Sequence, residues 1–246
     1  MDDKEILAGF DKLNGTLSLS AVVADSMGRA GVMISQIKPI DPSLQLIGRA
    51  VTVELTPGDL QDPLEVLEYV SEGDVIVMNA YGDTETSALG GLMGALFKLK
   101  GVRGAVIDGA CRDSDENRLQ GFQVFTRSLT PRGTHTMFSG RKNDIKYQVP
   151  IVCGGVSVHP GDYIAGDELG VVVVPKVRAV EVLKSATEQA EREAKTREKI
   201  QNGWTVQQIL ESPPSECGDA RRRFSPSGLR RNYTNRFTNI DNVASA

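Results

Sequence analysis

The stretch GVRGAVIDGACRD, residues 101–113, predicts a buried strand that is followed by a charged pair. The apolar run Ala105–Ile107 forms the strand, and Gly109 lets the backbone turn where a side chain would obstruct it. Adjacent residues on an extended chain point to opposite sides. Arg112 and Asp113 can therefore serve one site only if the chain turns close to Gly109.

The charged pair Arg112-Asp113 has two interpretations on the residues alone. An arginine offers a planar fork to a carboxylate or enolate oxygen, and an aspartate offers a hard oxygen to a divalent cation. Together they indicate a site for an anion and a metal. A surface ion pair at a loop explains the same two residues equally well.

The rest of the chain alternates helical and strand patterns, which predicts the α/β class. The expected helices cover residues 2–13, 18–28 (capped by Ser18 or Ser20), 62–72, 89–99 (capped within 84–87) and 178–201. The expected strands cover residues 48–55, 75–78, 105–107, 123–126, 151–153, 156–158, 163–165 and 171–174.

Three glycines, Gly90, Gly91 and Gly94, fall in the first turns of the helix expected over residues 89–99. Each costs about 1 kcal/mol of helix stability relative to alanine. One explanation is that something approaches the backbone closely, because a helix N-terminus with free N–H groups binds anions. Close packing of the helix on a strand explains the glycines as well.

Composition indicates an ordinary water-soluble globule of 246 residues, with 40% hydrophobic and 24% charged residues. No apolar run reaches the roughly 20 residues of a membrane span, and residues 1–5 lack a signal pattern, so we expect a cytoplasmic protein without membrane contact. Cys111, Cys153 and Cys217 form no Cys-x-x-Cys pair, which argues against a disulfide framework or a zinc site.

Charge divides the chain into an α/β domain over residues 1–212 and a tail over residues 213–246. The tail has six arginines against three acidic residues and no apolar period, so we expect it to be disordered. The acidic body is not expected to bind nucleic acid, whereas the tail could contact RNA, an acidic partner or nothing.

Three segments together resemble the RraA-like family: Gly90-Gly91-Leu92-Met93, residues 104–113, and GDELGVVVVP at 166–175. The likeness extends over about residues 15–203. This family joins class II pyruvate aldolases, such as 4-hydroxy-4-methyl-2-oxoglutarate aldolase, to the protein regulator of ribonuclease E. The resemblance implies a compact α/β/β sandwich assembled as a homotrimer or hexamer, whose long C-terminal helix packs on a neighbouring subunit.

The resemblance also implies an activity. It is that of a divalent-metal-dependent lyase, a class II pyruvate aldolase or oxaloacetate decarboxylase, that cleaves a pyruvyl-containing 2-keto acid through a metal-stabilised pyruvate enolate. In this chain Arg112 would hold the pyruvyl group and Asp113 would ligate Mg²⁺ or Mn²⁺. The backbone of Gly90–Met93, and in particular the N–H groups of Leu92 and Met93, would receive the substrate carboxylate.

Two acidic positions complicate the resemblance. The aldolase pattern has an acid where this chain has Gly91. Either Asp83 or Glu85 reaches in instead, or the site is altered or lost. A further acid from a neighbouring subunit would match Glu193, with Glu198 as the fallback, although either could be a solvated helix charge. The intact Arg112-Asp113 pair favours the lyase. Gly91 and the arginine tail leave open the alternative function, a non-enzymatic regulator that binds an RNA-processing enzyme, like the ribonuclease E inhibitor.

Overall fold

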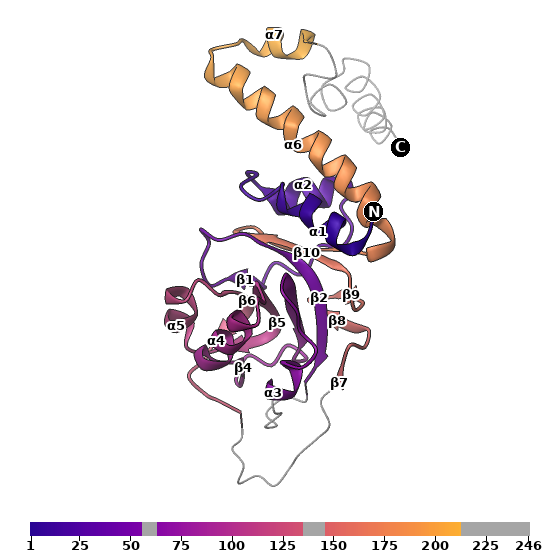
Figure 1. Ribbon diagram of the computed structural model, residues 1–246. Coiled ribbons are helices and arrows are strands. Elements are labelled where there is room, and N and C mark those ends of the chain that lie inside the picture. Colours follow the sequence, from indigo (N-terminus) through magenta and orange to yellow (C-terminus); the bar gives the residue numbers. More distant parts are fainter. Residues whose placement is uncertain (56–62, 135–145, 213–246) are drawn as a thin grey trace, which may run out of the picture. The chain divides into compact units, whose positions relative to one another are not determined.

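The computed structural model describes residues 1–55, 63–134 and 146–212 (Figure 1). The chain divides into two compact units, Met1–Ala186 and Thr187–Ala246, and each is described by itself. The expected tail, residues 213–246, lies outside the described residues, as do His135 and Cys217.

The first unit is built on one nine-stranded sheet. Its spatial order is β1 (Lys38–Pro39), β6 (Gln123–Leu129), β5 (Gly104–Cys111), β3 (Asp74–Asn79), β2 (Leu46–Glu54), β10 (Tyr163–Asp167) and β11 (Gly170–Val174). In addition, β4 (Ser87–Leu89) pairs with β5, and β7 (Lys146–Tyr147) pairs with β2. A separate hairpin consists of β8 (Ile151–Cys153) and β9 (Val156–Val158).

The four central strands, β6, β5, β3 and β2, run parallel to one another. The segment before β1 joins the two ends of the sheet. Val32 bridges Val172 of β11, and Lys38 then pairs with Thr126 of β6. The sheet is therefore almost closed into a barrel, and the α/β expectation is confirmed.

Seven α-helices are described: α1 (Asp3–Asp11), α2 (Leu19–Ser26), α3 (Pro63–Val66), α4 (Gly91–Leu99), α5 (Ser114–Leu119), α6 (Ala179–Gln201) and α7 (Val206–Glu211). The long helix expected over residues 178–201 is confirmed as α6, and Gly203 follows it with a φ of 78°. Within the described ranges, no helix combines the length and the apolar character that crossing a membrane requires.

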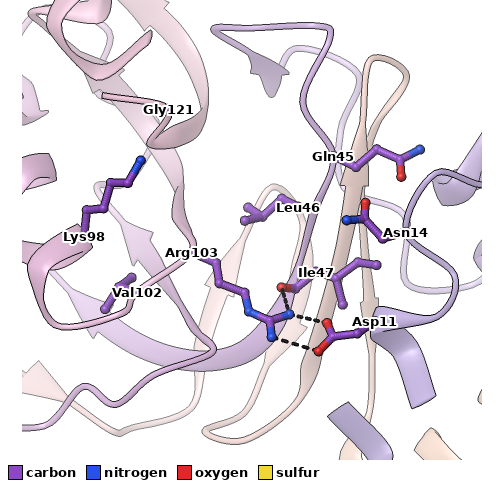
Figure 2. Close-up of a pocket in the computed structure, with 9 residues that line it drawn as sticks. All are labelled: Asp11, Asn14, Gln45, Leu46, Ile47, Lys98, Val102, Arg103 and Gly121. Atoms are coloured by element: carbon purple, nitrogen blue, oxygen red, sulfur yellow. Dashed lines mark hydrogen bonds and ion pairs between the residues drawn. The ribbon is translucent and has the colours of Figure 1, made fainter. Parts of the chain in front are cut away.

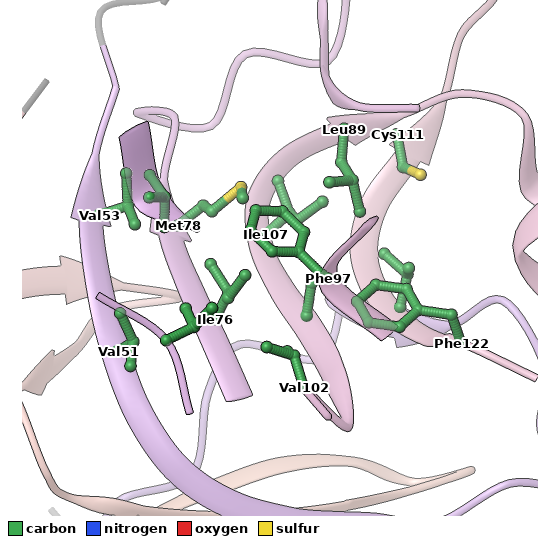
Figure 3. Close-up of a cluster of buried hydrophobic side chains, with 14 residues drawn as sticks. Val51, Val53, Ile76, Met78, Leu89, Phe97, Val102, Ile107, Cys111 and Phe122 are labelled. Atoms are coloured by element: carbon green, nitrogen blue, oxygen red, sulfur yellow. The ribbon is translucent and has the colours of Figure 1, made fainter. Parts of the chain in front are cut away.

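Hydrophobic side chains cover both faces of the central strands. Ile76 and Ile107 face one cluster, in which Phe97 of α4 packs (Figure 3). Their neighbours along the strands, Val75 and Val106, face a second cluster with β10 and β11. Because successive strand residues point to opposite faces, a continuous apolar run is what a doubly covered parallel strand requires.

The helix expected over residues 62–72 is wrong in length, since α3 ends at Val66. Beyond it, Glu68 and Tyr69 donate backbone hydrogen bonds only three residues back, which is turn geometry. The Tyr69 ring stacks on Tyr147 at a centroid distance of 3.9 Å, and the two hydroxyls are 2.7 Å apart. This tertiary contact takes precedence over the helical pattern.

The expected serine cap of α2 is also corrected. Ser18 stands at the N-cap position but makes no side-chain cap bond. Ser20 instead donates its backbone N–H (2.9 Å) and its hydroxyl (2.6 Å) to the buried carboxylate of Asp167. The serine thus fastens α2 to β10.

Candidate active site

The end of β5 lies beside the start of α4. Ser87 of β4 pairs with Ala110 of β5, and the Arg112 N–H donates to the Leu89 carbonyl at 3.0 Å. β4 occupies residues expected to cap the helix, and Gly90 is the N-cap without a side-chain bond. We call the resulting set of residues the α4 cradle: Gly90, Gly91, Leu92, Met93, Arg112 and Asp113.

The expected turn at Gly109 is wrong, because β5 continues through it to Cys111. A Cβ at Gly109 would lie 2.7 Å from the Ala80 Cβ, so glycine is needed there for close packing. The chain turns at Asp113, whose φ is 52°. That turn brings Arg112 Nε to 3.3 Å from Asp113 Oδ2, so the two side chains lie together. Their shared role in one site stays a prediction.

The cradle has free hydrogen-bond donors. The Gly91 N–H donates to Asp113 Oδ2 at 3.1 Å, whereas the N–H groups of Leu92 and Met93 have no acceptor among the described residues. A Cβ on Gly90 would lie 2.9 Å from Arg112 Nε. Glycine therefore leaves the guanidinium beside an open helix N-terminus, which is an arrangement suited to a carboxylate.

Glu116 of α5 lies against Gly91. A Cβ on Gly91 would be 2.1 Å from Glu116 Oε2 and 2.8 Å from the Glu116 Cβ. Asp83, in contrast, accepts backbone N–H bonds from Glu85 (2.8 Å) and Thr86 (3.3 Å) and so closes its own turn. The structure thus places the Glu116 carboxylate beside Gly91, where the resemblance expects an acid.

Helix α5 was not predicted, and it brings a second residue to the site. Asn117 is fully buried, and both its backbone N–H (3.1 Å) and its side-chain Nδ2 (3.2 Å) donate to the Asp113 carbonyl. A Cβ on Gly94 would lie 2.1 Å from Asn117 Oδ1. Gly94 therefore accommodates the packing of α4 on α5, not on a strand as expected, and Gly90 and Gly91 accommodate charged side chains of the protein itself. Anion binding at this helix start stays a prediction.

Cys111, next to Arg112 in the chain, is not a nucleophile. Burial, assisted by the Asp113 carboxylate, raises the pKa of the Cys111 thiol to about 12. The thiolate is the reactive form of cysteine. Chemistry at this site therefore depends on the charged side chains and the backbone.

Glu193 lies on the part of α6 that belongs to the second unit. Its carboxylate accepts hydrogen bonds from Gln189 Nε2 (3.1 Å) and Arg197 Nη2 (2.6 Å) on the same helix. These are the contacts of a helix-surface charge. Its role as an acid supplied by a neighbouring subunit stays a prediction.

Asp113 of the cradle and the neighbouring Glu116 fit a hard, hydrated cation. Within the described ranges, no three His, Cys, Asp or Glu side chains gather at metal-binding distance. Mg²⁺ retains several waters and takes only one or two protein carboxylates. Asp113 and Glu116 supply two carboxylates to the start of α4, which matches that preference.

A pocket of about 420 Å³ near the start of β2 has a different character (Figure 2). Arg103 spans it and donates two hydrogen bonds to Asp11 and one, of 3.0 Å, to the Ile47 carbonyl. Lys98, also at its wall, donates to the Gln120 carbonyl. Because Arg103 and Lys98 already bind groups of the protein, we interpret the pocket as a structural crevice beside α1 and not as a ligand site.

Known proteins share this architecture. A family model described as RraA-like, Aldolase/RraA, matches residues 20–173. A Halalkalibacterium halodurans protein named "Putative 4-hydroxy-4-methyl-2-oxoglutarate aldolase" is 35% identical over 190 residues, which are 77% of this chain and 88% of that protein. The solved structure of an uncharacterized protein from Pseudomonas syringae matches with a TM-score of 0.71 and 30% identity, over 83% of this chain and 96% of that one.

A second solved structure is that of Streptomyces coelicolor RraAS2, described as an unusual member of the RNase ES inhibitor RraA protein family. It matches with a TM-score of 0.64 and 30% identity, over 78% of this chain and 96% of that one. The family match covers more than half of the sequence and contains the whole α4 cradle. The chain therefore belongs to the RraA-like family of aldolase and RraA proteins.

Proposed function

We propose that the protein is a divalent-metal-dependent lyase that cleaves a pyruvyl-containing 2-keto acid. The reaction would be retro-aldol cleavage of the 4-hydroxy-4-methyl-2-oxoglutarate type, oxaloacetate decarboxylation, or both. The observation that carries the proposal is the contact of Arg112 and Asp113 with the open start of α4. The relatives named as aldolases support the reaction class.

The cradle provides distinct partners for the two ends of a pyruvyl group. The substrate carboxylate would accept hydrogen bonds from the N–H groups of Leu92 and Met93, where the helix dipole also favours an anion. Arg112 would donate to the 2-keto oxygen, on which negative charge develops. The Leu92 and Met93 N–H groups are fixed by the backbone of α4, so they need little reorganisation during the reaction.

Asp113 and Glu116 would hold the cation, proposed to be Mg²⁺ or Mn²⁺. When bound, such an ion supplies Lewis-acid polarisation of the keto oxygen. In retro-aldol cleavage the C4 hydroxyl loses its proton and becomes the carbonyl of the second product as the C3–C4 bond breaks. The electron pair of that bond forms the pyruvate enolate, which is then protonated at C3. Decarboxylation of oxaloacetate breaks the equivalent C3–C4 bond, releases C4 as CO2 and gives the same enolate, so one site can serve both reactions.

Glu116 is proposed to replace the acid that Gly91 lacks. Its Oε2 occupies the space into which a side chain at position 91 would project. A carboxylate there can orient the water that exchanges a proton with the substrate. Glu193 of a neighbouring subunit remains the proposed second acid.

The deciding experiment measures pyruvate release from oxaloacetate and from 4-hydroxy-4-methyl-2-oxoglutarate, with and without EDTA. Wild type should be active and EDTA should abolish the activity. Glu116→Gln should slow turnover by roughly 10²-fold, the scale of a lost general acid or base. Asp115→Asn, which changes an exposed acid on the same helix, is the matched control and should leave the rate unchanged.

A metal-dependent rate that Glu116→Gln leaves intact would remove Glu116 from the mechanism. No pyruvate release by wild type from either substrate would refute the lyase proposal. Mn²⁺ binding, followed by electron paramagnetic resonance, gives a second readout that does not depend on turnover.

One observation also favours the alternative function, a regulator that binds an RNA-processing enzyme. On α4, Leu92 and Leu99 are 79% and 84% exposed, so two of the expected apolar positions face outward, whereas Met93 and Phe97 pack on the core. Exposed apolar side chains at helical spacing are suited to a protein partner. Inhibition of ribonuclease E by the protein, lost in Leu99→Ser, would support this function, and no inhibition would refute it.

The same exposed face is compatible with the proposed homotrimer or hexamer. Light scattering at micromolar concentration tests that assembly, and a monomer mass would contradict it together with the shared role of Glu193. The cytoplasmic location stays a prediction from the sequence.

A further inference from the structure

The carboxyl ends of the central parallel strands carry a row of polar side chains. Glu54 of β2 is in register with Asn79 of β3, and Asn79 is in register with Asp108 of β5. Arg127 of β6 extends the row, because its Nε donates to Asp108 Oδ1. Asn79 and Asp108 are only 7% and 5% exposed, in strands that are otherwise apolar. We call Glu54, Asn79, Asp108 and Arg127 the polar row.

A pocket of about 570 Å³ opens over the polar row. Its opposite wall is formed by Pro150, Ile151 and Val152 at the start of the β8–β9 hairpin, and by Ser157 of β9. The wall is largely apolar, and Val152 and Ser157 are exposed. In α/β proteins, both with open sheets and with barrels, ligands bind at the carboxyl ends of the parallel strands, which is where this pocket lies.

Structural roles account for the acidic members of the row. Asp108 Oδ1 pairs with Arg127, and Asp108 Oδ2 accepts the Gly154 N–H at 2.7 Å, which anchors the β8–β9 hairpin. Glu54 pairs with Lys146 at 2.8 Å. Both carboxylates therefore already have cationic partners.

The donors of the row are not accounted for in this way. Among the described residues, Nη1 and Nη2 of Arg127 have no acceptor, and neither has Nδ2 of Asn79, whose Oδ1 accepts the Tyr81 N–H at 2.8 Å. A Cβ on Gly82 would lie 3.3 Å from Arg127 Cζ and 3.5 Å from Nη2, so a side chain at position 82 would cover the guanidinium and glycine leaves it uncovered. This leaves Nη1 and Nη2 as the polar groups of Arg127 that a ligand can use.

We propose that this pocket binds a small organic carboxylate. The unmatched groups are all donors, and the planar fork of arginine matches a carboxylate in a bidentate manner. The ligand carboxylate would bind Arg127 and Asn79, and its carbon chain would lie on Val152. The pocket shares no residue with the α4 cradle, so this proposal is independent of the lyase proposal.

The test is a calorimetric titration with succinate in the presence of EDTA. Wild type should bind succinate saturably. Arg127→Lys keeps the charge beside Asp108 but loses the fork, and Ser157→Phe fills the pocket without touching the buried ion pair. Each should weaken binding by at least about tenfold, the scale of one lost charge-assisted hydrogen bond.

Arg112→Lys is the control, because it alters the α4 cradle and should leave this affinity unchanged. Circular dichroism establishes whether each variant is folded. If Arg127→Lys does not fold, Ser157→Phe still tests the proposal. The proposal is overturned if wild type shows no saturable binding or if a folded Arg127→Lys or Ser157→Phe variant retains wild-type affinity. It is also overturned if Arg112→Lys abolishes binding, since succinate would then occupy the cradle.

Discussion

Introducing an acid at position 91 should lower the stability of the fold unless Glu116 is removed as well. In Gly91→Asp the new Cβ would lie 2.1 Å from Glu116 Oε2, 2.8 Å from its Cβ and 2.9 Å from its Cδ. The first contact involves a flexible chain end, but the second involves an atom fixed to the α5 backbone. Side-chain rotation alone therefore cannot relieve the overlap.

The magnitude follows from two opposing effects. Forcing extra volume into a packed contact typically costs about 1–3 kcal/mol, and the two carboxylates also repel each other. An acid in the first turn of a helix contributes about 0.3–1 kcal/mol of stabilisation. We therefore expect Gly91→Asp to lower the free energy of unfolding by about 1–2 kcal/mol.

Urea denaturation of Gly91→Asp, Glu116→Ala and the double variant forms a double-mutant cycle. Glu116→Ala should recover most of the loss, with a coupling energy of about 1–2 kcal/mol. The double variant should also release pyruvate faster than Glu116→Ala, because the carboxylate introduced on α4 then supplies the acid. Additive stabilities, within about 0.5 kcal/mol, would show that Glu116 does not occupy the space beside position 91.

Three further predictions concern stability and reactivity. Asp11→Asn should lower the free energy of unfolding by only about 0.5–1 kcal/mol in urea denaturation, because its ion pair with Arg103 is partly exposed and screened; a loss above about 3 kcal/mol would contradict this. Burial raises the pKa of Tyr163 to about 12. The unfolded chain therefore loses the Tyr163 proton at a lower pH than the folded chain does. The contribution of this group to the free energy of unfolding is fully present below about pH 10 and is lost as the pH rises through 12, by at most roughly 2–3 kcal/mol. Tyr163→Phe should flatten that decline in urea titrations at increasing pH, and an unchanged slope would refute the assignment. Cys111 should react with iodoacetamide at about pH 8 only after unfolding, as mass spectrometry of alkylated peptides would show, and rapid labelling of the folded protein would contradict its burial.

The central strands could be predicted from the sequence because their signal is local. Residues 75–78 and 105–107 are continuous apolar runs, and both lie in strands buried on both faces. The helix over residues 178–201 likewise has a long regular pattern and a glycine after its end. Patterns of this kind depend on neighbours along the chain, not on neighbours in space.

The partners of the glycines could not be predicted in the same way. Gly91 and Glu116 are far apart in the sequence, and their contact depends on how α4 and α5 pack. Helical spacing showed that α4 has an apolar side but not that Leu92 and Leu99 would be exposed. The spacing of Asp113 and Glu116 is that of a capping box and could have indicated α5. In the structure, the Asp113 side chain makes no cap hydrogen bond. The capping box would thus have predicted α5 correctly although the bond that defines the motif is not formed.

The polar row shows a related limit. Asn79 and Asp108 each end or interrupt an apolar run and look in the sequence like isolated polar residues. Only the parallel register of β3 and β5 places them side by side. The pairing register of two strands cannot be read from a single sequence, so nothing in the sequence indicated this pocket.

The central claim is that Arg112 binds the anion and Asp113 holds the metal, and it is tested most directly by measuring Mn²⁺ affinity and pyruvate release on the same three proteins. Asp113→Asn removes the charge of a hard-cation ligand, so it should bind Mn²⁺ more weakly and recover part of its activity in excess metal. Arg112→Lys should keep Mn²⁺ binding while turnover falls by roughly 10²-fold, the scale of one lost oxyanion donor. Wild-type Mn²⁺ affinity and wild-type rates in both variants would show that the two residues form only a surface ion pair.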